Sequence, residues 1–198
     1  MPEVPRAGVG EHRAPGSGRS PRTASQESPG VRGIDHVGIT VPDIDAATAF
    51  FRHALGAEVL YDTLRREDVP TTGPSMEQGL GVPEGTEEAA IRMLRLHHGP
   101  GLELFEFRAP RQREPVVPSD LGWQHLAVYV EDLEAAVLRV EQAGGTRLSS
   151  PRPLPGVEAG PRNRMTYTRT PWGSTLELIT YPDPQPYEQH TPHRRWRP

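Results

Sequence analysis

The sequence predicts an α+β fold made of two tandem β-α-β-β-β modules, and an internal repeat supports this prediction. The segment Gly33-Ile34-Asp35-His36 returns as Gly122-Trp123-Gln124-His125. Each copy also closes on a similar stretch, Leu102-Glu103-Leu104-Phe105 in the first and Leu176-Glu177-Leu178-Ile179 in the second. A repeat with chemically active residues at equivalent positions indicates two equivalent units with one site between them.

The first module is predicted from alternation and from helix-boundary residues. Residues 34–41 alternate around Ile34, His36 and Gly38 and end at Pro42, as in a β-strand. Asp43 is suited to cap a helix whose apolar positions recur at helical spacing up to Gly56. Further strands are predicted at 57–62, 90–96 and 102–107.

The second module repeats this design. Asp132 is the predicted cap of a helix that stops at Gly144 and Gly145. Strands are predicted at 146–149, 164–170 and 175–180. A turn at Thr170-Pro171-Trp172-Gly173 joins the last two strands.

The two copies differ in length mainly in the segment 64–89 of the first module. Pro70, Gly73 and Pro74 favour a long loop there. A loop of this length in a compact domain is either a lid or binding loop, or a tolerated surface insertion. The sequence supports both interpretations equally.

Composition sets the domain boundaries. Residues 1–32 are rich in Gly, Pro and Ser with few large apolar side chains, so we expect a disordered N-terminal extension. The domain covers 33–181, with module one at 33–110 and module two at 120–181, and a Pro-rich tail covers 182–198.

Charge and residue usage exclude several classes of function. The net charge of −4 offers no basic patch, so we expect no nucleic-acid partner. The absence of cysteine excludes thiolate chemistry, disulfides and Cys-type zinc sites. There is no apolar stretch long enough to span a bilayer and no apolar secretion signal, so we expect a cytoplasmic protein without a membrane partner.

The repeat carries one histidine and one glutamate per copy, which outlines a metal site. Side chains alternate along a strand, so Glu103 shares a face with Phe105 and Phe107, and His125 shares one with Ala127 and Tyr129. A carboxylate between apolar neighbours is costly unless it is paired or bound to metal. The four candidate ligands are His36, Glu103, His125 and Glu177. Two imidazoles and two carboxylates suit one divalent ion, namely Ni, Co, Zn, Mn or Fe.

Two roles are open to the aromatic residues that share these strand faces. Phe105, Phe107 and Tyr129 either line a substrate pocket or are packing residues. Glu106 is predicted to face away from Glu103 and not to be a ligand.

These residues resemble the vicinal oxygen chelate superfamily, which includes glyoxalase I, methylmalonyl-CoA epimerase, extradiol dioxygenases, and bleomycin- and fosfomycin-resistance proteins. The resemblance rests on Ile34-Asp35-His36-Val37-Gly38-Ile39, on its echo at His125, and on Pro171-Trp172-Gly173-Ser174-Thr175-Leu176-Glu177-Leu178. It implies a glyoxalase-like, cup-shaped mixed sheet around a metal held by His36, Glu103, His125 and Glu177. Four filled positions resemble the isomerase and lyase branch of the superfamily.

Two departures from the family pattern bear on the substrate. Glyoxalase I enzymes that use glutathione tend to follow the first glutamate with a polar run, whereas Glu103 is followed by Leu104-Phe105-Glu106-Phe107. Thr170 stands where the family usually has Asp, which we expect to alter the turn and not the chemistry. The resemblance therefore implies a metal site with a more apolar pocket.

The function expected is metal-assisted proton transfer next to a carbonyl, an isomerase or lyase reaction on a small oxygenated metabolite. Glu177 and Glu103 are the candidate catalytic carboxylates, and either is suited to act as the base. One alternative is an Fe(II) extradiol-type dioxygenase that uses His36, His125 and Glu177. The other is a metal-free, drug- or metabolite-binding resistance protein. We expect a homodimer, and the two modules could pair within one chain or across two.

Overall fold

A computed structural model gives the structure of the protein and describes residues 30–198. The predicted disordered extension 1–32 falls almost wholly outside the described residues. The chain divides into the units Met1–Gly33 and Ile34–Pro198, and the second unit carries the fold.

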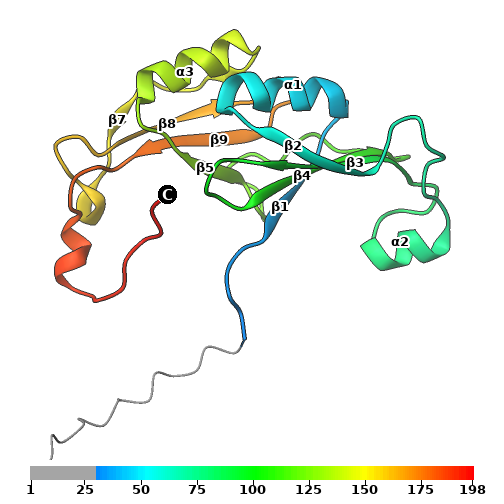
Figure 1. The fold of residues 1–198 in the computed structure, drawn as a ribbon, viewed down its shortest axis with the longest axis horizontal. Helices are drawn as coiled ribbons and strands as arrows, with labels where there is room; N and C mark the ends of the chain where they lie inside the picture. The colour runs from blue at the N-terminus through cyan, green and yellow to red at the C-terminus, as the bar shows by residue number, and fades with distance from the viewer. Residues whose placement is uncertain (1–29) are drawn as a thin grey trace, which may run out of the picture. The chain divides into compact units, whose positions relative to one another are not determined.

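Two mixed sheets, one per module, confirm the predicted fold class (Figure 1). In module one the strand order is β1-β4-β3-β2, and in module two it is β5-β9-β8-β6, with β7 paired to β8. The first strand of each module lies parallel to the last, and the other pairs are antiparallel. The elements are β1 (His36–Thr40), α1 (Ile44–Leu55), β2 (Glu58–Leu64), α2 (Pro74–Leu80), β3 (Glu87–Arg95), β4 (Gly101–Arg108), β5 (His125–Tyr129), α3 (Leu133–Gln142), β6 (Thr146–Arg147), β7 (Arg152–Pro153), β8 (Arg164–Arg169) and β9 (Thr175–Thr180).

The helix caps lie where the sequence predicts them. The Asp43 carboxylate accepts from the backbone N–H of Asp45 and Ala46, and α1 ends at Gly56 in the left-handed region with φ 70°. Asp132 caps α3 through the N–H of Ala135. These short polar side chains satisfy N–H groups that a helix leaves unpaired at its start.

One core joins the two modules. Helices α1 and α3 pack side by side and cover the same face of the sheets (Figure 1). The rings of Phe50 and Phe51 on α1 each meet Trp172 of the β8–β9 turn edge-on, with centroids 5.4 and 5.6 Å apart. Leu102 and Leu104 of β4 and Leu176 and Leu178 of β9 point into this core. Because side chains alternate along a strand, Glu103 and Glu177 lie on the sheet faces that point away from this core.

The segment 64–89 differs from the expected loop. It contains the helix α2, which begins with Pro74 at its first turn and ends at Gly81 with φ 67°. Glu77 of this helix accepts the N–H of Gly85 at 2.7 Å, and Thr71 forms a β-bridge with Glu88. Proline has its φ preset for a first helical turn, so the residues that indicated a loop begin a helix instead. No helix in residues 30–198 is long and apolar enough to cross a membrane.

Candidate metal centre

In module one, the register of β1 and β4 brings His36 and Glu103 together. His36 pairs with Gly101 and Gly38 pairs with Glu103, so the two functional side chains lie diagonally on one face. Nε2 of His36 is 3.1 Å from Oε2 of Glu103. A side chain at Gly101 would place its Cβ 3.3 Å from the Cβ of His36 and 2.8 Å from the sulfur of Met93. The glycine therefore leaves the space in which the imidazole sits.

Module two repeats the arrangement in the same register. His125 pairs with Thr175 and Ala127 pairs with Glu177, and Nε2 of His125 is 3.1 Å from Oε2 of Glu177. Both glutamates therefore sit two residues beyond the residue that pairs with the histidine. Equal spacing in two modules gives the two pairs equivalent geometry.

The side chain of the residue before each histidine contacts Nδ1, the second nitrogen of the imidazole ring. The Asp35 carboxylate lies 2.7 Å from Nδ1 of His36, and the Gln124 side-chain oxygen lies 3.3 Å from Nδ1 of His125. The hydrogen bond to Asp35 is the main cause that raises the pKa of His36, with the charge of Glu103 adding to it. An acceptor on Nδ1 fixes the ring and leaves Nε2 facing the glutamate, as in many histidine metal ligands.

Burial distinguishes the two glutamates. The Glu177 side chain is 11% exposed and the Glu103 side chain 19% exposed, whereas His36 is 38% exposed. Burial raises the pKa of Glu177, and the charges of His125 and Arg195 oppose that rise. A carboxylate with a raised pKa accepts and releases a proton more readily near neutral pH, which suits proton transfer.

The donor set fits a divalent ion. Each pair offers an imidazole nitrogen and a carboxylate oxygen 3.1 Å apart, and both are donor atoms that divalent first-row ions accept. The structure places His36 against Glu103 and His125 against Glu177 as two separate pairs, and residues 30–198 contain no group of three or more His, Asp or Glu able to hold a metal.

The predicted pocket residues flank the two pairs differently. The rings of Phe105 and Phe107 stack with centroids 5.5 Å apart on the face that carries Glu103. Tyr129 meets Tyr181 edge-on at 4.8 Å, on the face that carries His125 and Glu177. Module one therefore presents phenylalanine rings beside its pair, and module two presents tyrosines.

Glu106 lies on the opposite face from Glu103. It is 4% exposed, and its Oε2 accepts the backbone N–H of Ile44 at 2.9 Å and pairs with Arg66 at 3.3 Å. It thus caps α1, because a carboxylate is favourable at a helix N-terminus. Strand alternation therefore gives the two glutamates different roles: Glu103 faces the candidate site, and Glu106 stabilises the start of α1.

Sequence reasoning missed three polar residues on these faces. Glu88 is 8% exposed and pairs in register with Phe107, and its pKa is raised by burial with the charge of Glu103 adding to it. A bulge in β3 after Glu88 interrupts the alternation of faces, so the sequence pattern does not predict that Glu88 lies on this face. Tyr167 pairs with Glu177, a position that alternation along β8 could have shown. Arg195 lies in the tail, where no periodicity marks a site.

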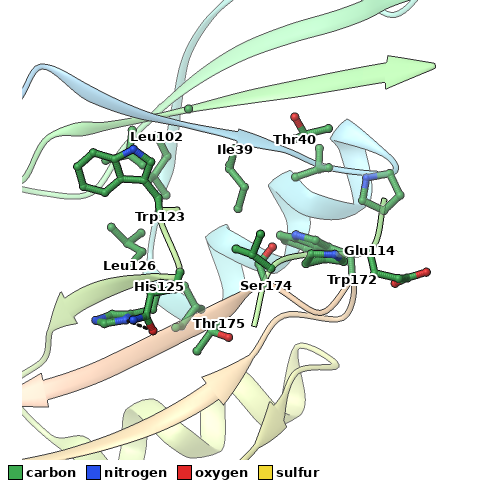
Figure 2. A pocket seen from close by; sticks show the side chains of 18 of the residues that line it. Ile39, Thr40, Leu102, Glu114, Trp123, His125, Leu126, Trp172, Ser174 and Thr175 are labelled. Atoms are coloured by element: carbon green, nitrogen blue, oxygen red, sulfur yellow. Dashed lines mark hydrogen bonds between the residues drawn. The ribbon is translucent and has the colours of Figure 1, made fainter. Parts of the chain in front are cut away.

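A groove of about 780 Å³ is lined by residues of both β1 and β5. Figure 2 shows Ile39 and Thr40 of β1 and His125 and Leu126 of β5 among its side chains. The groove is lined by both core and surface residues, among them Ile39, Trp123 and Trp172. Its lining includes His125 but not the other three predicted ligands. The groove therefore passes beside the module-two pair and is not itself the metal pocket.

The fold and the repeated histidine–glutamate pairs define a two-module protein with a glyoxalase-like fold. Residues 33–178 match the model of the Glyoxalase/Bleomycin resistance protein/Dioxygenase superfamily. The chain belongs to this superfamily.

A curated relative and two solved structures add to this result. The relative, a 2-epi-5-epi-valiolone epimerase from an Actinomyces species, is 40% identical over 173 residues, covering 86% of this chain and 91% of the relative. A glyoxalase family protein from Bacillus cereus has a TM-score of 0.60 at 20% identity, covering 79% of this chain and 98% of that one. The fosfomycin resistance protein FosX of Listeria monocytogenes, a structure with Mn(II) and 1S,2S-dihydroxypropylphosphonic acid, has a TM-score of 0.51 at 14% identity, covering 81% of this chain and 99% of that one. The two structures show the shared fold, and the relative supports the prediction of an isomerase-type enzyme.

Proposed function

We propose that the protein is a metal-dependent epimerase that moves a proton on the carbon next to a carbonyl of a small, hydroxyl-bearing ketone. The observation that carries this proposal is the repeated histidine–glutamate pair. In each module, the residue before the histidine contacts Nδ1 of the imidazole, and Nε2 lies 3.1 Å from a glutamate oxygen. His36, Glu103, His125 and Glu177 would hold a divalent ion. That ion, when bound, supplies charge stabilisation to the substrate oxygens.

The chain's own carboxylates account for the proton transfer. Epimerisation removes hydrogen from one side of a carbon and returns it on the other, so two carboxylates on different structural elements suit it. Glu177 and Glu103 lie in different modules and meet this condition. Burial raises the pKa of Glu177, which suits a carboxyl that takes up and releases a proton.

The name of the curated relative suggests the first compound to test, 2-epi-5-epi-valiolone. Purified protein reconstituted with Ni, Co, Mn, Zn or Fe is incubated with this ketone in deuterium oxide, and NMR follows exchange of the hydrogen next to the carbonyl. We expect exchange in the wild type and its loss in Glu177→Gln and Glu103→Gln. If no metal supports exchange in the wild type, the proposed reaction is wrong.

We also propose that the working form is a homodimer in which a pair from one chain meets the complementary pair of the other. Each pair lies open on the face of its own sheet, with His36 38% and His125 27% exposed. Leu121 and Trp123, just before β5, are 100% and 98% exposed, and exposed large apolar side chains mark interaction surfaces.

Mixing two inactive variants tests this arrangement. His36→Ala and His125→Ala each remove one ligand, so each variant alone loses activity and metal. Across two chains, a mixed dimer of the two variants contains one intact site, and activity and metal binding return on mixing. If sites form within single chains, mixing restores neither, and the cross-chain site is refuted.

A further inference from the structure

The C-terminal tail folds back over the face that carries His125 and Glu177. Tyr181 follows β9 and shares the side of Glu177 by alternation. The Oη of Tyr181 donates to the backbone oxygen of Trp196 at 2.8 Å. The guanidinium of Arg195 lies over the Tyr181 ring, 4.6 Å from its centroid. The tail therefore crosses the end of the module-two site face.

A buried polar latch anchors the start of the tail. The Asp183 carboxylate accepts three hydrogen bonds from Arg162, one from its backbone N–H at 2.6 Å and two from its guanidinium at 2.9 and 2.6 Å. Asn163, which is 0% exposed, exchanges hydrogen bonds with the backbone of Asp183. The Gln185 amide is 2% exposed and donates to the backbone oxygen of Glu158. The Asn163 amide, with both its oxygen and its nitrogen hydrogen-bonded, is the kind of buried group that specifies one conformation.

Further contacts fix the orientation of Arg195. Its Nη1 pairs with Glu158 at 2.6 Å, and its backbone N–H donates to Oη of Tyr187 at 2.8 Å. The Tyr181 ring beneath the guanidinium meets Tyr129 edge-on at 4.8 Å, and Tyr129 ends the strand that begins at His125. An arginine offers five N–H donors, and the side-chain hydrogen bonds that the described residues 30–198 make with Arg195 use Nη1 alone. The guanidinium, with its side chain 35% exposed, thus retains donors beside the site face.

We propose that Arg195 is a substrate-binding residue that holds neutral hydroxyl or carbonyl oxygens of a compound bound at the His125–Glu177 pair. This inference rests on the proposed function for the identity of the substrate. The residues around the guanidinium indicate which oxygens it binds. Glu158 already balances the charge of the guanidinium, so a phosphate or carboxylate ligand at this place would meet a like charge. Neutral hydroxyls accept from the free N–H groups without that repulsion.

Arg195→Gln tests the binding role, with Arg194→Gln as the matched control. Arg194 lies on the same tail and pairs with Glu188 instead. With metal-loaded protein and 2-epi-5-epi-valiolone, we expect Arg195→Gln to raise KM about ten-fold or more, the effect of losing hydrogen bonds to a charged group. We expect kcat to change less, and metal content and melting temperature to match the wild type. Arg195→Lys keeps the charge and should recover part of the affinity.

Direct binding separates this inference from the reaction itself. Calorimetry measures binding of the same ketone and of its phosphate monoester to wild type and both variants, whether or not turnover occurs. Binding of the neutral ketone that weakens in Arg195→Gln supports the inference even if no proton exchanges. Unchanged binding in Arg195→Gln, tighter binding of the phosphate ester than of the ketone, or no binding of the ketone to the wild type would each overturn it.

Discussion

Glu103 and Glu106 lie three residues apart on β4, and we expect their replacement by glutamine to affect different properties. Glu103→Gln should weaken metal binding, whereas Glu106→Gln should lower stability. Glu106 accepts the N–H of Ile44 and pairs with Arg66, whereas Glu103 contacts His36 on the other face. A hydrogen bond to a charged group contributes about 1.5–3 kcal/mol and a neutral one about 1 kcal/mol, so Glu106→Gln loses about 1–2 kcal/mol there. The Arg66 side chain is 40% exposed, so solvent screens its ion pair with Glu106 and that pair adds little.

The total of about 2 kcal/mol corresponds to a fall in melting temperature of about 4–8 °C for a chain of this size. Bound metal itself stabilises a fold, so the melting curves are recorded on metal-free protein, and metal is then measured after reconstitution. We expect Glu106→Gln to melt lower and bind metal normally. Glu103→Gln should melt close to the wild type and bind metal poorly. Loss of metal in Glu106→Gln with unchanged melting would refute this division of roles.

Three further predictions follow from burial and charge. Burial raises the pKa of Glu88, so the folded state holds its proton to higher pH than the unfolded state and stability falls as pH rises through that interval. The melting temperature of Glu88→Gln relative to the wild type should therefore increase with pH, and a pH-independent difference would contradict this. Phe51→Ala, at a fully buried ring between the modules, should cost about 3–5 kcal/mol. The control Leu138→Ala, at a side chain that is 53% exposed, should change stability by less than about 0.5 kcal/mol in the same denaturant titration. Hydrogen bonds from Arg162 lower the pKa of Asp183, so the latch stabilises the fold above the unfolded pKa and is lost as pH falls through the folded pKa. The gap in melting temperature between wild type and Asp183→Asn should accordingly shrink on acidification, and a constant gap would argue against the latch.

The repeat predicted most of the fold because its signals are local. Asp43 and Asp132 cap helices through their own backbones, and the alternation along β4 and β9 fixes which face each glutamate takes. Those rules act over a few residues, and they need no knowledge of what packs nearby. The two histidine–glutamate pairs follow from the same rules applied twice.

The remaining features depend on contacts that local patterns do not encode. Glu88 joins the site face only because a bulge shifts the register of β3 against β4. Pro74 signals a break in structure equally well whether a loop or the helix α2 follows. Arg195 reaches its position through a latch that begins at Asp183, and nothing in a Pro-rich tail predicts where it will dock.

The two modules carry equivalent histidine–glutamate pairs in different surroundings. Beside Glu103 lie the stacked rings of Phe105 and Phe107, whereas the face around Glu177 carries Tyr129 and Arg195. In the homodimer that we propose, a substrate between complementary pairs would meet an apolar wall on one side and hydrogen-bond donors on the other. A hydroxyl-bearing ring has edges of both kinds, so such a site would bind it in one orientation. Stereochemical control would then come from these unlike walls, because the two histidine–glutamate pairs are too similar to distinguish one side of the substrate from the other.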